Sequence, residues 1–324
     1  MSARKYPVEM ANLVCKFGKK NLLDYFEEIV LPAFTDEDNR RVYGDTKYFF
    51  GDVELVTVEG RVLLVGRFIK DMLFEREQVF TSSGLVEDHD EMQSSPSCLF
   101  VLILDIHRLI FLKETKFAPS LDNFKSTLDA FLKKKYREFI DAAANAAKKS
   151  GEKITKKQLM LDNIVPTLEL IPLTSAQDIE TFVRQYDVLS SVTYKFSDRN
   201  DEHDNEGFFE AVQRQKDEVG SKTTTIKHSN SDGLDKDSVI EEVQAATIQG
   251  NQKVMLVGKD SSGTELRGDN KEFQLKSFVE LTSNAPAIAA PTLYHKFKQL
   301  VGDGMIQVSV PALGAIAKLR SYLE

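Results

Sequence analysis

Basic side chains are concentrated in one short segment of this 324-residue chain. Residues 131–157 hold nine lysines and arginines against three acids. Ammonium and guanidinium groups at this density can neutralise the phosphates of a nucleic-acid backbone and release its counterions. Lysines outnumber arginine eight to one, which fits point-charge contacts with phosphate better than bidentate recognition of guanine. The segment therefore predicts sequence-independent binding through Lys133, Lys134, Arg137, Lys148, Lys149, Lys153, Lys156 and Lys157.

The same segment has a plainer interpretation, as the solvated face of a helix followed by a flexible linker. The whole chain carries a net charge of −8, so the +6 of this segment leaves −14 for the rest. An acidic total argues weakly against nucleic acid as a partner, but binding follows the local field and not the sum. Both interpretations stay open at the level of sequence.

Carboxylates near an apolar stretch raise the question of nuclease chemistry. Asp105 and Glu114, with Lys113, flank the run "CLFVLILDIHRLIFLKE" at residues 98–114. Two-metal hydrolysis needs clustered carboxylates, and Asp105 is better explained as a turn residue. His89 and its acidic neighbours in "EDHDE" could hold a metal, but a charge run in a polar loop is usually solvated.

Other catalytic signatures are missing from the sequence. It has no glycine-rich phosphate loop and no nucleophile elbow. Cys15 and Cys98 lack the spacing of metal ligands and lie in apolar runs, which predicts buried free thiols in a reducing compartment. We therefore expect a protein that is not an enzyme, with no catalytic residue, no metal and no cofactor.

The element that carries the basic segment is a long amphipathic helix. Ser120 is placed to cap it and Gly151 to end it, which predicts about 30 residues and about 45 Å. Residues 152–157 then read as a linker. An apolar stripe holds the helix to its domain through Leu121, Phe124, Leu128, Phe131, Leu132, Tyr136, Phe139, Ile140 and Ala143.

The remaining patterns predict an α+β fold of two domains, 1–155 and 156–324, joined by that helix. Antiparallel hairpins and mixed elements fill both domains. Further basic contacts could come from Lys253, Lys259 and Arg267 around the Gly263 turn. The individual elements expected in the first domain are a helix over 21–34 ended by Pro32, a hairpin of strands 46–58 and 61–69, a loop over 82–97, and a hairpin over 98–114 buried on both faces.

The order of elements resembles the RexA-like family of phage-exclusion proteins. The resemblance is distant and rests on four stretches: "SCLFVLILDIHRLIFLKETKFAPSLDNF", "PTLELIPLTSAQDIETFVRQYDVLSSVTYKF", "DKDSVIEEVQAATIQGNQKVMLVGKDSSGTEL" and "TLYHKFKQLVG". The Lys259-Asp260 pair stands before the Gly263 turn, where the family has a similar turn. The longer basic helix and the acidic loop at 197–206 depart from the family pattern.

This resemblance implies a homodimer that binds double-stranded DNA without sequence preference and acts with a small integral membrane protein during phage infection. The soluble component of Kiwa-type anti-phage defence is a related possibility. Two other function classes stay open: a nuclease of a defence system, and an interaction or scaffold protein that binds no nucleic acid. A duplex gel shift with and without Mg²⁺ separates the three.

The sequence also predicts the cellular location of the protein and its oligomeric state. The first ten residues lack the apolar core of a signal peptide, and the longest apolar run, 98–106, is too short for a membrane span. We expect a cytoplasmic protein, or one recruited to the inner membrane by its partner. The apolar run 305–323 predicts dimerisation through the second domain, with burial inside its own chain as the competing interpretation.

Overall fold

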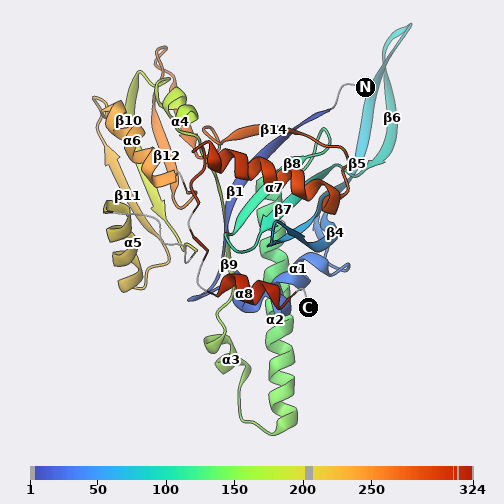
Figure 1. The fold of residues 1–324 in the computed structure, drawn as a ribbon. Coiled ribbons are helices and arrows are strands. Elements are labelled where there is room, and N and C mark those ends of the chain that lie inside the picture. The colour runs from blue at the N-terminus through green and yellow to red at the C-terminus, as the bar shows by residue number, and fades with distance from the viewer. Residues whose placement is uncertain (1–3, 201–206, 248, 309, 312–313, 323–324) are drawn as a thin grey trace.

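The computed structural model describes residues 4–200, 207–247, 249–308, 310–311 and 314–322. In this part of the chain it has an α+β fold with two antiparallel sheets, which confirms the predicted fold class. The large sheet occupies the centre of Figure 1, and the small sheet lies to its left. None of the helices described combines the length and apolar character needed to cross a membrane.

The large sheet is organised around its first strand. One edge of β1 pairs with β8, and the other edge pairs with both β14 and β9, which lie end to end along it. The strand order is β14-β1-β8-β7-β5-β4-β3. Its strands are β1 (Lys5–Phe17), β2 (Lys20–Asn21), β3 (Arg41–Tyr43), β4 (Thr46–Val58), β5 (Arg61–Thr81), β6 (Gly84–Ser94), β7 (Ser97–Ile103), β8 (Arg108–Lys113), β9 (Thr167–Pro172) and β14 (Lys276–Glu280).

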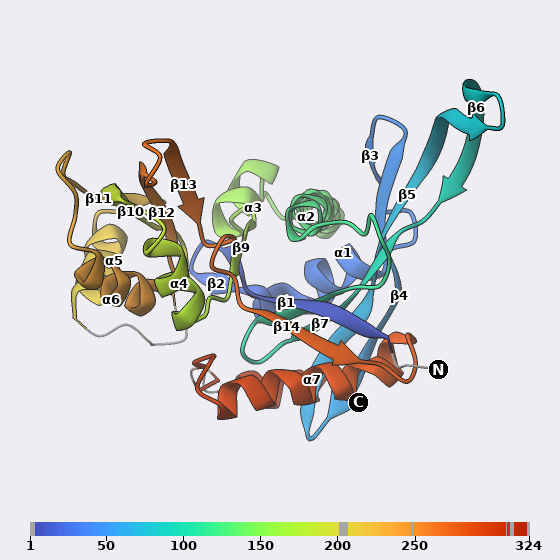
Figure 2. The same ribbon diagram turned by 90° about the horizontal axis from the view of Figure 1, so that it is seen from above.

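Helices cover both faces of the large sheet and create two apolar cores. On one face, α2 (Leu121–Ser150) packs with η1 (Leu22–Tyr25), η2 (Phe26–Val30) and α1 (Leu31–Thr35). On the other face lies α7 (Pro286–Gly302), as Figure 2 shows. Phe124 of α2 is central to the first core, because its ring lies 5.2–6.3 Å from those of Phe34, Phe50, Phe68, Phe100 and Phe111.

The β7–β8 hairpin is buried on both faces, as predicted. Phe100 and Leu102 face the core of α2, whereas Leu99 and Val101 face the core of α7. Asp105 lies in the connecting turn, also as predicted. A strand covered on both sides has no polar alternation, which explains its continuous apolar sequence.

The small sheet has its own core. Its strands are β10 (Val188–Phe196), β11 (Thr224–Ser229), β12 (Lys253–Lys259) and β13 (Glu265–Asp269), in the order β11-β10-β12-β13. One face is covered by α4 (Ala176–Val183), α5 (Phe208–Glu218) and α6 (Lys236–Thr247) (Figure 2). Buried Val192, Tyr194 and Leu256 pack there with Ile240 and Val243 of α6.

The small sheet is inserted into the large unit through a neck of two adjacent chain segments. The Leu275 amide donates a hydrogen bond of 2.9 Å to the Leu173 carbonyl, and Thr174 pairs with Gln274. The large sheet therefore contains strands from both sides of the predicted domain boundary between residues 155 and 156. Strands β9 and β14 join the large sheet as partners of one edge of β1, and α7 packs on a face of that sheet.

One local expectation was wrong, and a second, the helix over 21–34, was confirmed in its helical character but not in its form or in the role of Pro32. Residues 82–97 were expected to form a loop, but 84–94 are strand β6, paired with an extension of β5. This hairpin projects into solvent on both sides, so it has no apolar alternation to mark it. Residues 21–34 form three short helices of different pitch, and Pro32 stands in the first turn of α1, where its missing N–H costs nothing, instead of ending a helix.

The apolar C-terminal run is partly buried within its own chain. Ile306 is 2% exposed in the core of α7, and Leu319 of α8 (Ala315–Arg320) is 2% exposed in the core of α2. The ring centroid of Tyr322 lies 4.9 Å from that of Phe26, with the two rings tilted by 33°, and the Tyr322 hydroxyl donates a hydrogen bond to the Leu23 carbonyl. These interactions favour internal burial for those residues. Residues 309, 312–313 and 323 of the run lie outside the described part.

A candidate nucleic-acid interface

The predicted long helix exists with the predicted ends. The Ser120 hydroxyl accepts a hydrogen bond from the Asn123 amide, and Gly151 ends α2 in the left-handed conformation at φ 77°. The chain then turns into α3 (Lys156–Asp162), which begins inside the expected linker and is capped by Thr155. Tyr136 of α2 donates a hydrogen bond of 2.7 Å to the Asn163 carbonyl and so ties the end of α3 to α2.

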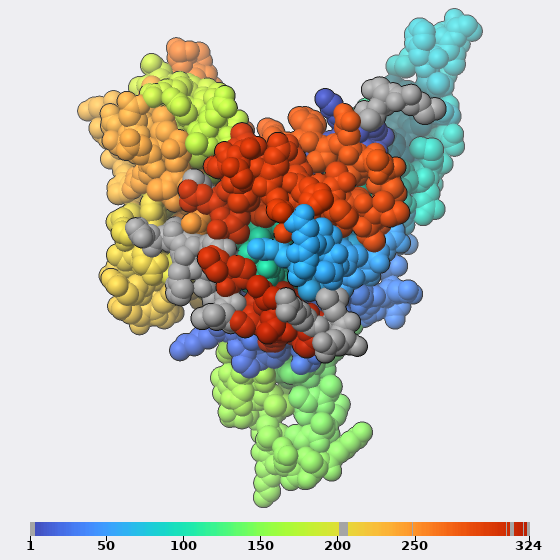
Figure 3. Space-filling model, viewed as in Figure 1, coloured from blue at the N-terminus to red at the C-terminus, as the bar shows by residue number. Residues whose placement is uncertain are grey.

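The distal part of α2, the turn and α3 form what we call the basic arm, residues 137–162. Up to Ile140 the apolar stripe of α2 is buried against the large sheet, whereas most side chains from Asp141 onward are exposed. Figure 3 shows the arm standing clear of the body at the bottom of the view. A projecting arm presents its charges on several sides at once.

The basic residues of α2 and α3 fall into two groups. Lys133 pairs with Asp129 at 2.6 Å, Lys134 donates to Asn39 at 2.8 Å, and Lys156 pairs with Asp141. The other five predicted residues are exposed and have no hydrogen-bond or ion-pair partner among the described residues. They are Arg137, Lys148, Lys149, Lys153 and Lys157. Only this second group is free to meet an external anion without first breaking an existing interaction.

Lys135 lies among these residues but has a structural role. Its side chain is 11% exposed and pairs with Asp36 and Glu138. The hydrogen bond from Lys135 is the main reason that the pKa of Asp36 lies below its usual value. The position of Lys135 next to the apolar stripe predicts such packing, so this residue does not belong to the predicted phosphate-binding set.

The three later basic residues lie on the uncovered face of the small sheet. Val254 and Leu256 of β12 point to the helices, so Lys253 and Lys259 point the other way. Arg267 of β13 lies opposite Val257 and shares that face. Two of these residues are already paired: Lys253 with Glu169 at 2.5 Å and Arg267 with Glu265 at 2.6 Å.

Sequence reasoning missed two further basic residues on this face. Lys195 of β10 lies directly opposite Lys253, and Lys227 of β11 lies opposite Thr193 on the same face. Both are exposed. Their alternation with buried neighbours could have placed them on an open face, but only the pairing of β10 with both β11 and β12 brings them beside Lys253.

The basic arm and this open face lie on the same side of the molecule. Figure 2 shows α2 and α3 on the upper side of the large sheet, and the open face of the small sheet also turns upward. Glu169 of β9 links the two parts, because it pairs with Lys125 of α2 at 2.6 Å and with Lys253 of β12. Burial acts to raise the pKa of Glu169, but the two ammonium groups outweigh it and hold that pKa below the usual value.

The carboxylates considered for nuclease chemistry are not assembled into a site. Asp105 is 3% exposed and pairs with Arg61 at 3.0 Å, while Glu114 is 5% exposed and pairs with Arg67 at 3.2 Å. They lie at opposite ends of β8, about 20 Å apart at the rise of an extended strand. Nowhere in the described residues do three His, Cys, Asp or Glu side chains group as a metal site requires.

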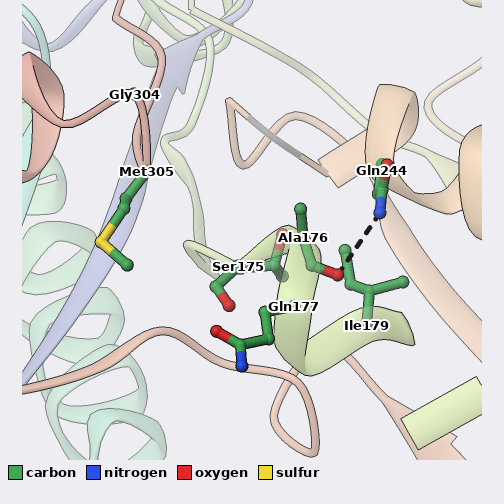
Figure 4. A pocket seen from close by; sticks show the side chains of 8 residues that line it. Ser175, Ala176, Gln177, Ile179, Gln244, Gly304 and Met305 are labelled. Atoms are coloured by element: carbon green, nitrogen blue, oxygen red, sulfur yellow. Dashed lines mark hydrogen bonds between the residues drawn. The ribbon is translucent and has the colours of Figure 1, made fainter. Parts of the chain in front are cut away.

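The cysteines and a cavity at the neck add no catalytic group. Both thiols are free and buried, and desolvation raises the pKa of Cys15 to about 12, which removes the thiolate needed for nucleophilic attack. A cavity of about 200 Å³ lies at the neck (Figure 4). Of the residues that line it, Ser175 caps α4, and the Gln244 side chain donates a hydrogen bond to the Ala176 carbonyl.

Comparison with models of known protein families finds no match, and neither does comparison with curated proteins.

Proposed function

We propose that this chain binds double-stranded DNA through its phosphate backbone, without sequence preference and without catalysis. The observation that carries the proposal is the group of five exposed, unpartnered cations on the basic arm: Arg137, Lys148, Lys149, Lys153 and Lys157. An ammonium group with no carboxylate beside it gains the full benefit of a phosphate, whereas a paired one must first give up its partner.

The open face of the small sheet supplies a second set of cations. Lys195, Lys227 and Lys259 have no ion-pair partner among the described residues. A duplex seated against this face and the arm would meet cations from both units, since both face the same side of the molecule. Lysine predominates in both sets, so they recognise charge and shape but not base identity.

The primary test is charge reversal on the arm. Changing Arg137, Lys148, Lys149, Lys153 and Lys157 together to Glu should weaken duplex binding at least a hundredfold in a low-salt gel shift. Each phosphate interaction removed in this way should also reduce the slope of log affinity against log salt by about one. Equal competition by unrelated duplexes would support sequence independence, and cleavage of the duplex on adding Mg²⁺ would contradict a non-catalytic role.

A matched variant locates the dominant surface. Lys195, Lys222, Lys227, Lys259 and Lys276 are also five exposed lysines, on the small sheet, beside it and on β14. Their joint change to Glu alters the net charge as much as the arm variant does. Because the arm is proposed to supply the main interface, we expect this variant to lose only several-fold in affinity for the duplex. If this variant loses binding while the arm variant binds like the parent protein, the interface lies on the small sheet and the arm is a solvated face.

The biological setting that we propose rests on the resemblance to RexA-like phage-exclusion proteins. In this setting the protein is a homodimer that responds to phage infection. It is cytoplasmic, or it is held at the inner membrane by a small integral membrane protein. Co-expression with the product of a neighbouring membrane-protein gene should lower the plating efficiency of phage. The arm variant should abolish that protection if DNA binding is part of it.

A further inference from the structure

A second projection lies at the end of the molecule opposite the basic arm. It is the outer part of β5 and β6, residues 71–94, which we call the acidic hairpin; it rises at the upper right of Figures 1 and 3. It carries seven acids and one arginine, a net charge of −6. The basic arm, residues 137–162, carries six basic residues against four acids, a net charge of +2.

Acids of the hairpin face one another without compensation. Glu75 lies directly opposite Glu91, an arrangement that is destabilising in a β-ladder. The one arginine, Arg76, is already paired with Asp88 and Asp90. Glu75, Glu77, Glu87 and Glu91 thus form no ion pair in the described structure, and together with Arg76 they line a hollow of about 400 Å³. Cations supplied from outside would relieve this repulsion.

Exposed apolar side chains accompany the charge on both projections. Phe80 and Leu85 pair across the tip of the acidic hairpin and are 80% and 63% exposed. On the basic arm, Leu161 is 60% exposed, and Ile154 and Met160 are also exposed. Clustered large apolar groups on a surface mark a site of association and not only of solvation.

We propose that the acidic hairpin of one copy of this chain binds the basic arm of a second copy. The acidic hairpin carries a net negative charge and the basic arm presents five unpartnered cations, and each surface offers apolar side chains to the other. They lie at opposite ends of the same molecule, so they meet only between molecules. A second copy is the occupant because it brings the complementary surface wherever the chain is present.

This interface would use the cations that we assign to DNA. Glu75, Glu87 and Glu91 present carboxylates to Arg137, Lys148 and Lys149 of the second copy in place of phosphates. Duplex and second copy would therefore compete for the arm, and release of the hairpin would accompany DNA binding. The competition rests on the proposed function, whereas self-association does not.

Exchange of charges between the two surfaces tests the interface. The arm variant carries the five changes to Glu given above, and the hairpin variant carries Glu75, Glu77, Glu87 and Glu91 changed to Lys. In sedimentation velocity at low salt, the full-length parent should self-associate, and each variant alone should associate at least tenfold more weakly. An equimolar mixture of the two variants should associate again, because each then offers the other an opposite charge.

Other outcomes would overturn the proposal. It fails if the parent is a monomer at every concentration, if the arm variant associates like the parent, or if folded variants do not associate when mixed. Association that disappears in EDTA would assign the hairpin to a divalent cation instead. The five-lysine variant outside the arm controls for net charge and should associate like the parent.

DNA binding by the same variants is measured separately. Under the proposal, the hairpin variant binds a duplex several-fold more tightly than the parent, since its competitor is gone. If no variant and no parent binds DNA while the mixture associates, the proposed function falls and the interface between copies stands.

Discussion

Lys135 and Arg137 lie two positions apart on α2 in opposite surroundings. Lys135 is 11% exposed and bonded to Asp36, whereas Arg137 is exposed and unpartnered in the described structure. Lys135→Met should lower the free energy of unfolding by about 1–2 kcal/mol, because it leaves the carboxylate of Asp36 without its cation. Arg137→Met should change it by less than about 0.5 kcal/mol. Urea unfolding measures both.

The two substitutions should affect DNA binding in the opposite order to their effects on stability. Arg137→Met should reduce the salt slope of binding by about one, and Lys135→Met should leave it unchanged. An equal effect of the two substitutions on DNA binding would mean that total charge, and not the exposure of individual residues, governs the interaction.

Glu169 gives the stability a specific dependence on pH. Its folded-state pKa lies below the usual 4.5, so its contribution is present above pH 4.5 and is lost as the pH falls through the folded-state value. Glu169→Gln should cost about 1–3 kcal/mol at pH 7, and the difference from the parent should shrink below pH 4.5. Glu265→Gln, in the exposed pair with Arg267, should cost under about 1 kcal/mol at any pH.

At the scale of elements, close packing of β12 on β10 depends on Gly258. A Cβ built there would lie 2.2 Å from the Val188 carbonyl oxygen and 2.7 Å from the Tyr186 ring. Gly258→Ala should therefore destabilise the protein by about 1–3 kcal/mol, by forcing the strand away from its neighbour. Gly302→Ala at the end of α7 has open space and should be neutral or slightly stabilising. Thermal unfolding of the two variants compares them directly.

Elements with strong periodicity could be predicted from the sequence. The stripe from Leu121 to Ile140, with its cap and its terminal glycine, defined α2, and the apolar run at 98–114 defined a buried hairpin. The acidic hairpin could not be found in this way, because β6 touches no core and its strands show no alternation. The open face of the small sheet brings together Lys195, Lys227 and Lys253. This depends on strand pairings between distant segments, which local patterns do not encode.

At the scale of the whole molecule, the neck predicts which fragments fold. The small unit has a separate apolar core, and it meets the large unit mainly through polar interactions such as the hydrogen bond from Asn12 to the Gly250 carbonyl. A fragment of residues 173–275 should unfold cooperatively in urea, since both ends of the neck are retained. A fragment of residues 156–324 should aggregate, because β9 and β14 lose their partner strand β1 and α7 loses most of the sheet that it covers.

The fragment comparison has a clear failing result. If residues 156–324 form a stable, cooperative unit and residues 173–275 do not, the division of the chain lies near residue 155, where the sequence pattern places it. Circular dichroism and light scattering at the same protein concentration distinguish the two cases.

The position of β1 in the large sheet affects the order of events during synthesis. Lys5 pairs with Glu280, so β1 leaves the ribosome long before its partner strand β14 is synthesised. At about 5–20 residues per second, the free edge of β1 waits roughly 13–50 s for β14. Throughout that interval an unpaired strand edge is open to other nascent chains. Production of this protein in cells should therefore depend on chaperones that shield the edge of β1 until β14 has been synthesised.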